Sequence, residues 1–320
     1  MRPSIRGIAY AFPSESRSVR ELAAEGALES DPAVLEGFGF ARVHVADEES
    51  PYALAHAAAS RVLAEAAADP STVGLLVYAG APGAVAFAPA TSAADAAAGL
   101  CTTDRFRFPA CRLQYELGLG GAAVLALDQL ACTSLFGAVR VARALMAAEG
   151  VERVVCVASE FYPSRAGREA IYNCTSDAAC AVLLDREGER NRVVGAATIT
   201  KGYYWDAAAM REEVVASYFP TAAHAIRRTL ADAGWRPDQV DWVIPHNVSV
   251  RSWEILLRLT GLRGARLWTR NVAAHGHTLA GDNFINLRDA TAAGDVRPGE
   301  RALLFSYGYG AHWTGLAVEA

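Results

Sequence analysis

Apolar runs of strand length alternate along this chain with alanine-rich stretches of helical length. We expect strands at residues 5–12, 73–79, 122–127, 151–159, 177–184, 193–200, 240–245, 301–307 and 314–319. We expect helices at residues 19–26, 51–68, 108–117, 136–147, 212–233, 251–260 and 279–293. Because the strand runs are largely apolar without alternation, they indicate buried sheets. Their alternation with helices predicts an α/β protein.

Three stretches carry finer expectations. Residues 122–127, AAVLAL, are apolar at every position, which predicts a buried strand. The runs 177–184 and 193–200 are separated by a short polar segment, and we expect them to pair as a hairpin. Residues 81–103 are rich in Ala, Gly, Pro and Ser, which predicts a long loop.

The chain contains an internal repeat. Residues 63–81, LAEAAADPSTVGLLVYAGA, match residues 230–248, LADAGWRPDQVDWVIPHNV, in pattern and without a gap. In both halves a helix and an apolar strand then follow, ending in GVERVVCVASE and in RPGERALLFSYGYG. Two matches in the same order predict two halves of one topology, which we place at 1–185 and 186–320.

Composition excludes several classes of function. The chain has 320 residues, 52% of them hydrophobic, which is enough for a large core. The net charge is −5 and basic residues form no stripe, so nucleic acid is not an expected partner. We find no apolar run of membrane-spanning length and no signal-peptide pattern at the N-terminus. We therefore expect a soluble, cytoplasmic protein that does not bind membranes.

Cysteine spacing argues against structural cysteine chemistry. The six cysteines are Cys101, Cys111, Cys132, Cys156, Cys174 and Cys180. No two of them form a CxxC pair, so we expect neither a disulfide framework nor a metal site.

Three side chains stand where chemistry is expected in an α/β protein. Cys132 follows the run 122–127 and precedes a helix, whose N-terminus favours a thiolate. His246 ends the second-half strand, and His277 precedes a helix at the second-half place that matches Cys132. Active sites of α/β folds gather at the carboxyl ends of strands, so these residues can meet. The alternatives are an inert buried cysteine, a core histidine and a turn histidine.

Five segments carry a resemblance to a known family. They are FPACRLQYELGLGGAAVLALDQLACTS, SDAACAVLL, DWVIPHNVSVR, GHTLAGDN and SYGYGAHWTGLAV. In their order and spacing they resemble the thiolase-fold condensing enzymes, most closely the β-ketoacyl-acyl-carrier-protein synthase III type. The resemblance covers most of the chain. It implies a homodimer with a thiolase-like fold, in which two pseudo-repeated halves form a five-layered αβαβα sandwich.

The resemblance also implies roles for individual residues. Cys132 would take the acyl group as a thioester, and His246 would donate a hydrogen bond to a thioester carbonyl or act as a base. The backbone N–H groups of Cys132 and Gly310 would form an oxyanion hole. Arg251 and Asn247 would meet the phosphopantetheine arm or its carrier protein. We expect Asp177, in SDAACAVLL, to brace the backbone.

Two departures from the synthase III pattern bear on the reaction. His277 stands where these enzymes usually have Asn, whereas chain-elongating synthases carry a histidine there. His277 would be either a second hydrogen-bond donor to an enolate or the base that deprotonates an acceptor. Residues 31–40, DPAVLEGFGF, lack the Trp and Arg of the coenzyme A clamp. This favours donors bound to an acyl carrier protein over acyl-coenzyme A.

The resemblance therefore implies acyl transfer through Cys132, in biosynthesis of the fatty-acid or polyketide type. Our first expectation is decarboxylative Claisen condensation with a malonyl-carrier protein. The alternative is transfer of the acyl group to a hydroxyl or amine, and a third possibility is a non-catalytic partner of a synthase. No cofactor is implied beyond the phosphopantetheine thioesters of acyl carrier protein or coenzyme A that serve as substrates.

Overall fold

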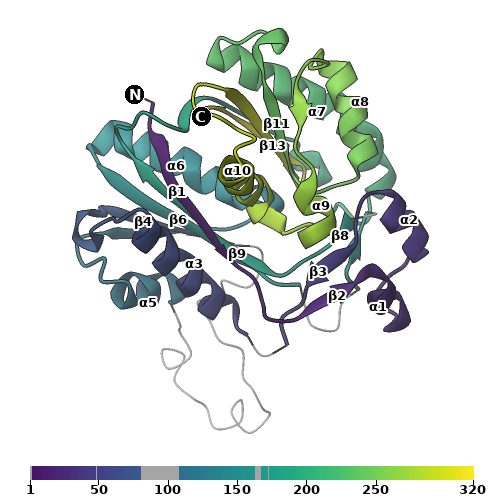
Figure 1. Ribbon diagram of the computed structural model, residues 1–320, viewed down its shortest axis with the longest axis horizontal. Coiled ribbons are helices and arrows are strands. Elements are labelled where there is room, and N and C mark those ends of the chain that lie inside the picture. Colours follow the sequence, from purple (N-terminus) through teal and green to yellow (C-terminus); the bar gives the residue numbers. More distant parts are fainter. Residues whose placement is uncertain (1, 48, 81–107, 163–166, 172) are drawn as a thin grey trace, which may run out of the picture.

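The computed structural model describes residues 2–47, 49–80, 108–162, 167–171 and 173–320 (Figure 1). The strands of the first half are β1 (Ser4–Ala11), β4 (Leu75–Ala79), β5 (Ala123–Leu127), β6 (Arg153–Glu160) and β9 (Ala178–Asp185). Those of the second half are β10 (Arg192–Thr200), β11 (Trp242–Pro245), β12 (Arg266–Leu267), β13 (Arg301–Gly308) and β14 (His312–Glu319). The predicted boundary at 185/186 falls between β9 and β10.

The helices and two small strand pairs complete the described part of the chain. The helices are α1 (Val19–Ala24), α2 (Pro32–Gly37), α3 (Pro51–Glu65), α5 (Pro109–Glu116), α6 (Ser134–Glu149), α7 (Arg211–Ala233), α8 (Val250–Thr260), α9 (Arg270–His275) and α10 (Asp282–Ala292). The small pairs join β2 (Ser16–Ser18) to β3 (Arg42–His44) and β7 (Glu169–Ala170) to β8 (Asn173–Cys174).

The ten strands of the described halves form one sheet whose two parts repeat a single topology. Its order is β12-β11-β13-β14-β10-β1-β9-β6-β4-β5. In each half the strand next to the edge, β4 or β11, is parallel to both of its neighbours. β9 and β14 run antiparallel to β6 and β13. The halves meet where Ser4 of β1 pairs with Arg192 of β10. The repeat seen in the sequence thus falls on β4 and β11.

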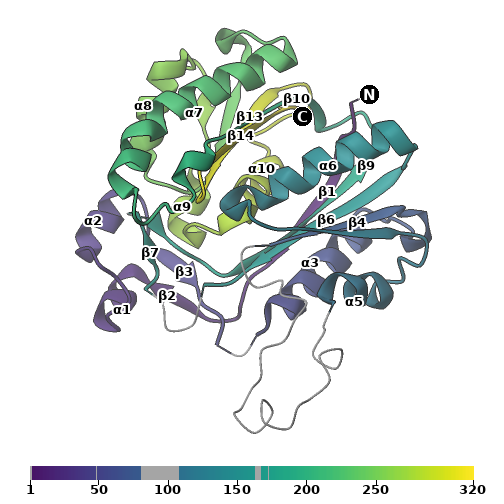
Figure 2. The same cartoon turned by 180° about the vertical axis from the view of Figure 1, so that it is seen from behind.

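Helices cover the strands in layers, which gives the five-layered αβαβα arrangement (Figures 1 and 2). Helices α3 and α5 pack on the outer face of the first half, and α7 and α8 lie on the outer side of the second. Helices α6 and α10 lie between the halves, where the rings of Phe136 and Phe284 contact edge to face at 5.2 Å. The chain therefore has the thiolase-like fold that its motifs implied.

Helix α6 has the apolar composition of a buried helix. The expectation that no apolar run reaches membrane-spanning length was wrong: among the described residues, Ala131–Glu149 is long and apolar enough to cross a membrane by length and composition alone. It comprises α6 and the turn before it, and Phe136, Val139 and Met146 are completely buried in the middle layer. This is the position of a core helix in a layered α/β fold.

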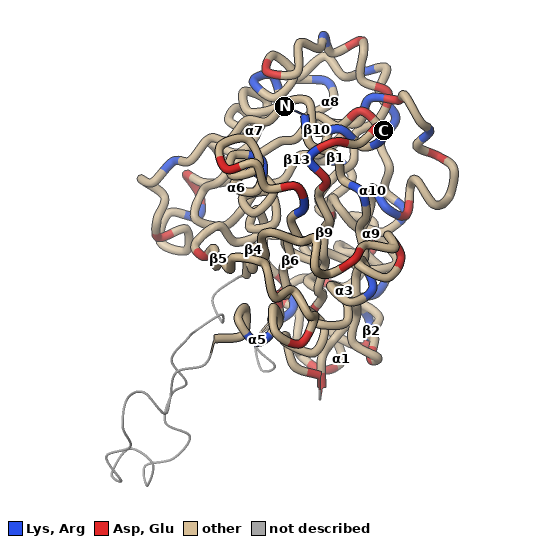
Figure 3. The backbone as a smooth tube through the Cα atoms, turned by 90° about the vertical axis from the view of Figure 1, so that its left-hand side faces the viewer, with Lys and Arg blue, Asp and Glu red and all other residues tan. Residues whose placement is uncertain are grey.

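Acidic and basic residues are interspersed along the chain in the side view (Figure 3).

The structure corrects two strand expectations. β9 and β10 do not form a hairpin, because β1 lies between them and pairs with both. β5 is a strand as predicted, but it is the last strand of the sheet, and Ala123, Leu125 and Ala126 are exposed. An apolar run does not distinguish a central strand from an edge strand whose apolar side chains face outward. The predicted loop at 81–103 lies outside the described residues.

Helices α2 and α9 were not predicted. α2 has a recognisable start, because the side chain of Asp31 accepts a hydrogen bond from Ala33 N and Pro32 occupies the first turn. Both helices are only six residues long. Hydrophobic periodicity is a weak signal over so few positions.

Candidate active site

Cys132 lies in a 3-10 turn, Ala131–Thr133, that leads directly into α6. Ala131 has a φ of 43°, in the left-handed region that residues other than glycine rarely adopt. Cys132 itself is half-buried. The predicted passage from strand to turn to helix is confirmed, and it places the thiol at the N-terminal end of a buried helix. There the helix dipole favours the thiolate.

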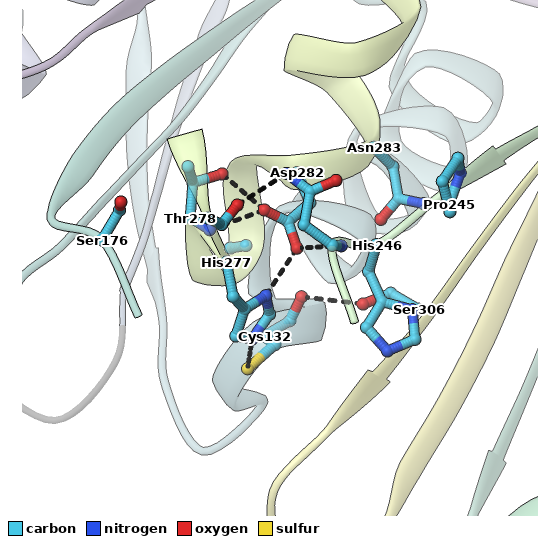
Figure 4. Close-up of polar contacts among 12 residues, drawn as sticks. Cys132, Ser176, Pro245, His246, His277, Thr278, Asp282, Asn283 and Ser306 are labelled. Atoms are coloured by element: carbon cyan, nitrogen blue, oxygen red, sulfur yellow. Dashed lines mark hydrogen bonds and ion pairs between the residues drawn. The ribbon is translucent and has the colours of Figure 1, made fainter. Parts of the chain in front are cut away.

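His277 meets Cys132 from the other half of the molecule (Figure 4). Its Nε2 lies 3.3 Å from the Sγ of Cys132, and its Nδ1 lies 2.5 Å from Oδ2 of Asp282. Gly276, just before it, has a φ of 62°, and a Cβ there would come within 2.8 Å of the Cys174 carbonyl. Glycine is therefore required at this turn, which aims the imidazole at the thiol.

Asp282 is the third member of this line of contacts, and sequence reasoning missed it. It is the first residue of α10 and is completely buried. Its carboxylate also accepts hydrogen bonds from the N–H and hydroxyl of Thr278 and from the N–H of Asn247, at 2.6 to 2.7 Å. Burial alone would raise the pKa of Asp282, but the nearby His277 and these hydrogen bonds lower it. A carboxylate five residues after a candidate histidine, inside GHTLAGDN, was the available signal.

The same contacts set the charge of His277. Burial disfavours the imidazolium, but the Asp282 carboxylate and the Cys132 sulfur outweigh it and raise the pKa of His277 well above its ordinary value. The favoured form of His277 next to the Cys132 sulfur is therefore the imidazolium. The contacts among Cys132, His277 and Asp282 thus have the arrangement of the nucleophile, base and orienting acid in a catalytic triad.

His246 is buried at the end of β11, with its ring centroid 6.1 Å from that of His277. Burial and the neighbouring His277 lower the pKa of His246 to about 4, so the ring is neutral at physiological pH. Its Nδ1 lies 3.3 Å from the carbonyl oxygen of Phe305. Since a carbonyl only accepts hydrogen bonds, this contact places the proton on Nδ1 and leaves Nε2 as an acceptor.

Asn247 braces the site from behind. Its side-chain N–H₂ group donates to the carbonyl of Gly276 at 2.7 Å, and its Oδ1 accepts from Asn286 at 2.8 Å. It is 1% exposed. These bonds hold the side chain of Asn247 against the His277 turn, and its predicted contact with a phosphopantetheine arm stays a prediction. Asn283 braces neighbouring backbone by donating to the carbonyls of Ile244 and Phe305.

The loop that carries Gly310 lies against the Cys132 turn. A Cβ on Gly308 would come within 2.5 Å of the Leu130 carbonyl, and the Ser306 hydroxyl donates to the Cys132 carbonyl at 3.3 Å. The oxyanion hole formed with Gly310 stays a prediction, and this proximity is consistent with it. Arg251 is exposed on the first turn of α8, outside this hydrogen-bonded cluster, and its contact with a carrier also stays a prediction.

Asp177 braces the backbone, as expected. Its carboxylate accepts hydrogen bonds from the N–H groups of Ala46 and Tyr162, at 2.8 and 2.7 Å. It also accepts two from the buried guanidinium of Arg168, at 2.8 and 3.0 Å. Within the ranges that the structure describes, no group of three His, Cys, Asp or Glu side chains has metal-binding geometry.

Comparisons with known proteins identify the family of this chain. The family model for 3-oxoacyl-[acyl-carrier-protein] synthase III matches residues 128–202, and the model for its C-terminal part matches residues 230–320. Together they cover just over half of the chain. The chain is 26% identical to the β-ketoacyl-[acyl-carrier-protein] synthase III of Rhizorhabdus wittichii, over 99% of both proteins.

Solved structures show the same fold. The 3-oxoacyl-[acyl-carrier-protein] synthase III of Aquifex aeolicus superposes with a TM-score of 0.80 at 20% identity, over 99% of this chain and all of that one. A structure named "ChlB3 [Aceyltransferase]" superposes with a TM-score of 0.83 at 19% identity, over 100% of this chain and 98% of that one.

Proposed function

Because the chain belongs to the 3-oxoacyl-[acyl-carrier-protein] synthase III family of acyl-transferring condensing enzymes, we propose that it loads an acyl group on Cys132 and passes it to a hydroxyl or amine. The observation that carries this proposal is the continuous line of contacts from Cys132 through His277 to Asp282. In such an arrangement Nε2 of His277 takes the proton of the Cys132 thiol, which creates the thiolate. The same Nε2 later acts as the base in the transfer step.

Loading begins with the thiolate–imidazolium pair. The Cys132 sulfur attacks the carbonyl carbon of an acyl thioester, and the bond from that carbon to the phosphopantetheine sulfur breaks. The proton on Nε2 of His277 goes to the departing thiolate, which leaves as a thiol. The N–H groups of Cys132 and Gly310 would hold the oxyanion of the tetrahedral intermediate.

Transfer to the acceptor uses the same imidazole as a base. The acceptor O–H or N–H gives its proton to Nε2 as its oxygen or nitrogen attacks the acyl-Cys132 carbonyl. Collapse of the intermediate breaks the bond to Sγ and restores the thiolate. Asp282 accepts the Nδ1–H throughout, which fixes the tautomer with Nε2 bare and stabilises the imidazolium.

Once His277 has given its Nε2 proton to the departing thiol, the tautomers of both imidazoles favour this reaction over condensation. Stabilising an enolate after loss of carbon dioxide requires N–H groups that point at its oxygen. In their neutral forms His277 directs its proton to Asp282, and His246 directs its proton to the carbonyl of Phe305. Each ring then offers the site an acceptor nitrogen, which suits removal of a proton from an acceptor.

Decarboxylative condensation with a malonyl-carrier protein is the second candidate. The observation that favours it is the presence of a second buried imidazole, His246, beside His277. Donors for either reaction would be thioesters of an acyl carrier protein or coenzyme A, and the reaction needs no resident cofactor. The absence of a Trp and Arg in residues 31–40 supports carrier-bound donors. We place the reaction in the cytoplasm, as part of fatty-acid or polyketide-type biosynthesis.

A homodimer is part of the proposal. β5 is the last strand of the sheet, and no strand of the described residues pairs with its outer side. Its exposed residues include Leu125, which is 38% exposed. An apolar edge strand is a template for pairing with another chain, and a second copy of this chain offers the identical strand.

Mass spectrometry of the intact protein tests the function. The protein is incubated with acyl-carrier proteins and acyl-coenzyme A thioesters, and then with either malonyl-carrier protein or a panel of alcohols and amines. We expect an acyl mass on the wild type that leaves with an alcohol or amine and survives malonyl-carrier protein. Loss of the acyl mass with release of carbon dioxide would establish condensation instead.

Two variants assign the roles. Cys132→Ala should not load, and loading of this variant would remove the central claim. His277→Asn should lose transfer to the acceptor by about 10²-fold or more, because an amide donates hydrogen bonds but is no base. Retained transfer in this variant would show that His277 acts only as a donor.

A further inference from the structure

A buried carboxylate outside the triad links the two turns that carry Cys132 and His277. Glu160 ends β6 and is 3% exposed. Its Oε1 accepts a hydrogen bond from the hydroxyl of Ser134 at 3.0 Å, and its Oε2 accepts one from the N–H of Ala280 at 2.8 Å. Ser134 comes two residues after Cys132, and Ala280 comes three residues after His277.

Both turns contain strained backbone. Ala131 precedes Cys132 with a φ of 43°, and Leu279 follows His277 by two residues with a φ of 56°. Residues with side chains adopt this region at a cost of about 1–3 kcal/mol, so surrounding contacts must hold them there. The side chain of Glu160 bonds to Ser134, the first residue after the Cys132 turn, and to Ala280 in the other turn, and so spans the gap between the two turns.

Those turns come from different halves of the molecule. The Cys132 turn, Ala131–Thr133, leads into α6. The His277 turn, the 3-10 turn Leu279–Gly281 that follows His277, leads into α10. The distance between Sγ and Nε2 therefore depends on how these two middle-layer helices sit against each other. We propose that Glu160 is a positioning residue that fixes the Cys132 and His277 turns at the separation needed to form the thiolate.

The chemistry of Glu160 fits this role in both of its charge states. Burial raises the pKa of Glu160 to about 7, while the bonds to Ala280 and Ser134 and the neighbouring His277 act in the opposite direction. The ionised carboxylate accepts from both partners. The protonated acid still accepts from Ala280 and can donate to the Ser134 oxygen, so the link persists through titration.

The inference rests on the proposed function only in taking Cys132 and His277 as the reacting pair. The test is the rate at which iodoacetamide alkylates Cys132, followed by the mass of the peptide that contains Cys132, because the exposed Cys111 would add the same mass to the intact protein. The rate is measured from about pH 5 to about pH 10. This readout needs no acyl donor and reports thiolate directly. At about pH 6.5, two units below the ordinary thiol pKa of about 8.5, wild-type Cys132 should react well above the rate of a free thiol.

Glu160→Ala should reduce that rate by about 100-fold and shift the alkylation profile to higher pH, because a misplaced imidazole no longer supports the thiolate. Glu160→Gln should stay within about threefold of wild type, since its amide oxygen accepts from Ala280 and its N–H₂ donates to Ser134. Ser134→Ala removes one of the two hydrogen bonds to Glu160. Its alkylation rate should lie between those of Glu160→Ala and Glu160→Gln.

The matched control is Ser159→Ala. Ser159 is the adjacent residue of β6, and its hydroxyl donates to the Pro51 carbonyl, so the variant loses a buried hydrogen bond away from the two turns. It should lose thermal stability and keep the wild-type alkylation profile. An unchanged profile in Glu160→Ala would overturn the inference. If that variant does not fold, an unchanged profile in Ser134→Ala would do so. A wild-type rate no faster than a free thiol would contradict the proposed function instead.

Discussion

Asp282 shows how a single buried side chain decides the chemistry of its neighbours. It fixes which nitrogen of His277 carries the proton, and its negative charge favours the imidazolium next to Cys132. A histidine without this partner could present either nitrogen to the thiol. The choice between hydrogen-bond donor and base, which the sequence left open, therefore depends on a residue five positions away.

Asp282→Asn should lower acyl transfer by roughly 10²–10⁴-fold. The amide cannot stabilise the imidazolium, so the pKa of His277 falls and the Cys132 thiolate forms only at higher pH. Single-turnover acyl transfer measured across pH checks this prediction, with Asp289→Asn as the control on the same helix. A profile of Asp282→Asn that matches wild type would mean that Asp282 only holds the backbone of Thr278.

At the scale of elements, β3 and α9 meet in a second histidine pair behind the site. Nε2 of His44 lies 3.0 Å from Nδ1 of His275, and the ring of His44 stacks on Phe12 at 4.1 Å. The hydroxyl of Ser176 accepts from the N–H of His44 and donates to the carbonyl of His275. Since His275 is two residues from His277, this junction holds the catalytic turn against the first half of the chain.

This junction should make stability depend on pH. Burial, followed by the nearby His275 and Arg42, lowers the pKa of His44 to about 4. The unfolded histidine, with an ordinary pKa of about 6.5, therefore binds a proton between these values while the folded one does not. The contribution of His44 to stability is complete above about pH 6.5 and is lost as pH falls toward 4.

Urea unfolding at several pH values measures this effect. His44→Gln should reduce the loss of unfolding free energy between about pH 6.5 and about pH 4. The exposed His224 of α7 provides the control, His224→Gln. Equal slopes for wild type and His44→Gln would show that His44 does not contribute to the pH dependence.

At the scale of the whole molecule, the repeat explains why the site lies where it does. Each half sends one helix, α6 or α10, into the middle layer, and each of these helices is preceded by a strained 3-10 turn. Cys132 stands in the first of these turns, and His277 comes just before the second. Packing α6 against α10 brings the two turns together, so the candidate active site forms from two equivalent positions.

The proposed dimer is tested at β5, the edge strand of the first half that lies farthest from its junction with the second half. Leu125→Lys places a charge on the exposed apolar edge of β5 and should convert a dimer to a monomer in sedimentation velocity. Val215→Lys is the control, because Val215 is a similarly exposed aliphatic residue on α7. An unchanged sedimentation coefficient for Leu125→Lys would place any dimer contact elsewhere.

The sequence by itself determined most of the strands of the large sheet, most of the helices, their repeat and two of the three residues in the proposed triad. These follow from local patterns, because a strand, a helix or a glycine turn leaves its signature within a few neighbouring positions. Tertiary structure alone decided that β1 separates β9 from β10, that β5 is exposed, and that Asn247 faces Gly276. It also brought Asp282 and Glu160 to the site. No local pattern encodes the order of strands in a sheet. Nor does one encode a hydrogen bond between residues more than 100 positions apart, such as Glu160 and Ala280. Both arise only when the strands and helices pack together.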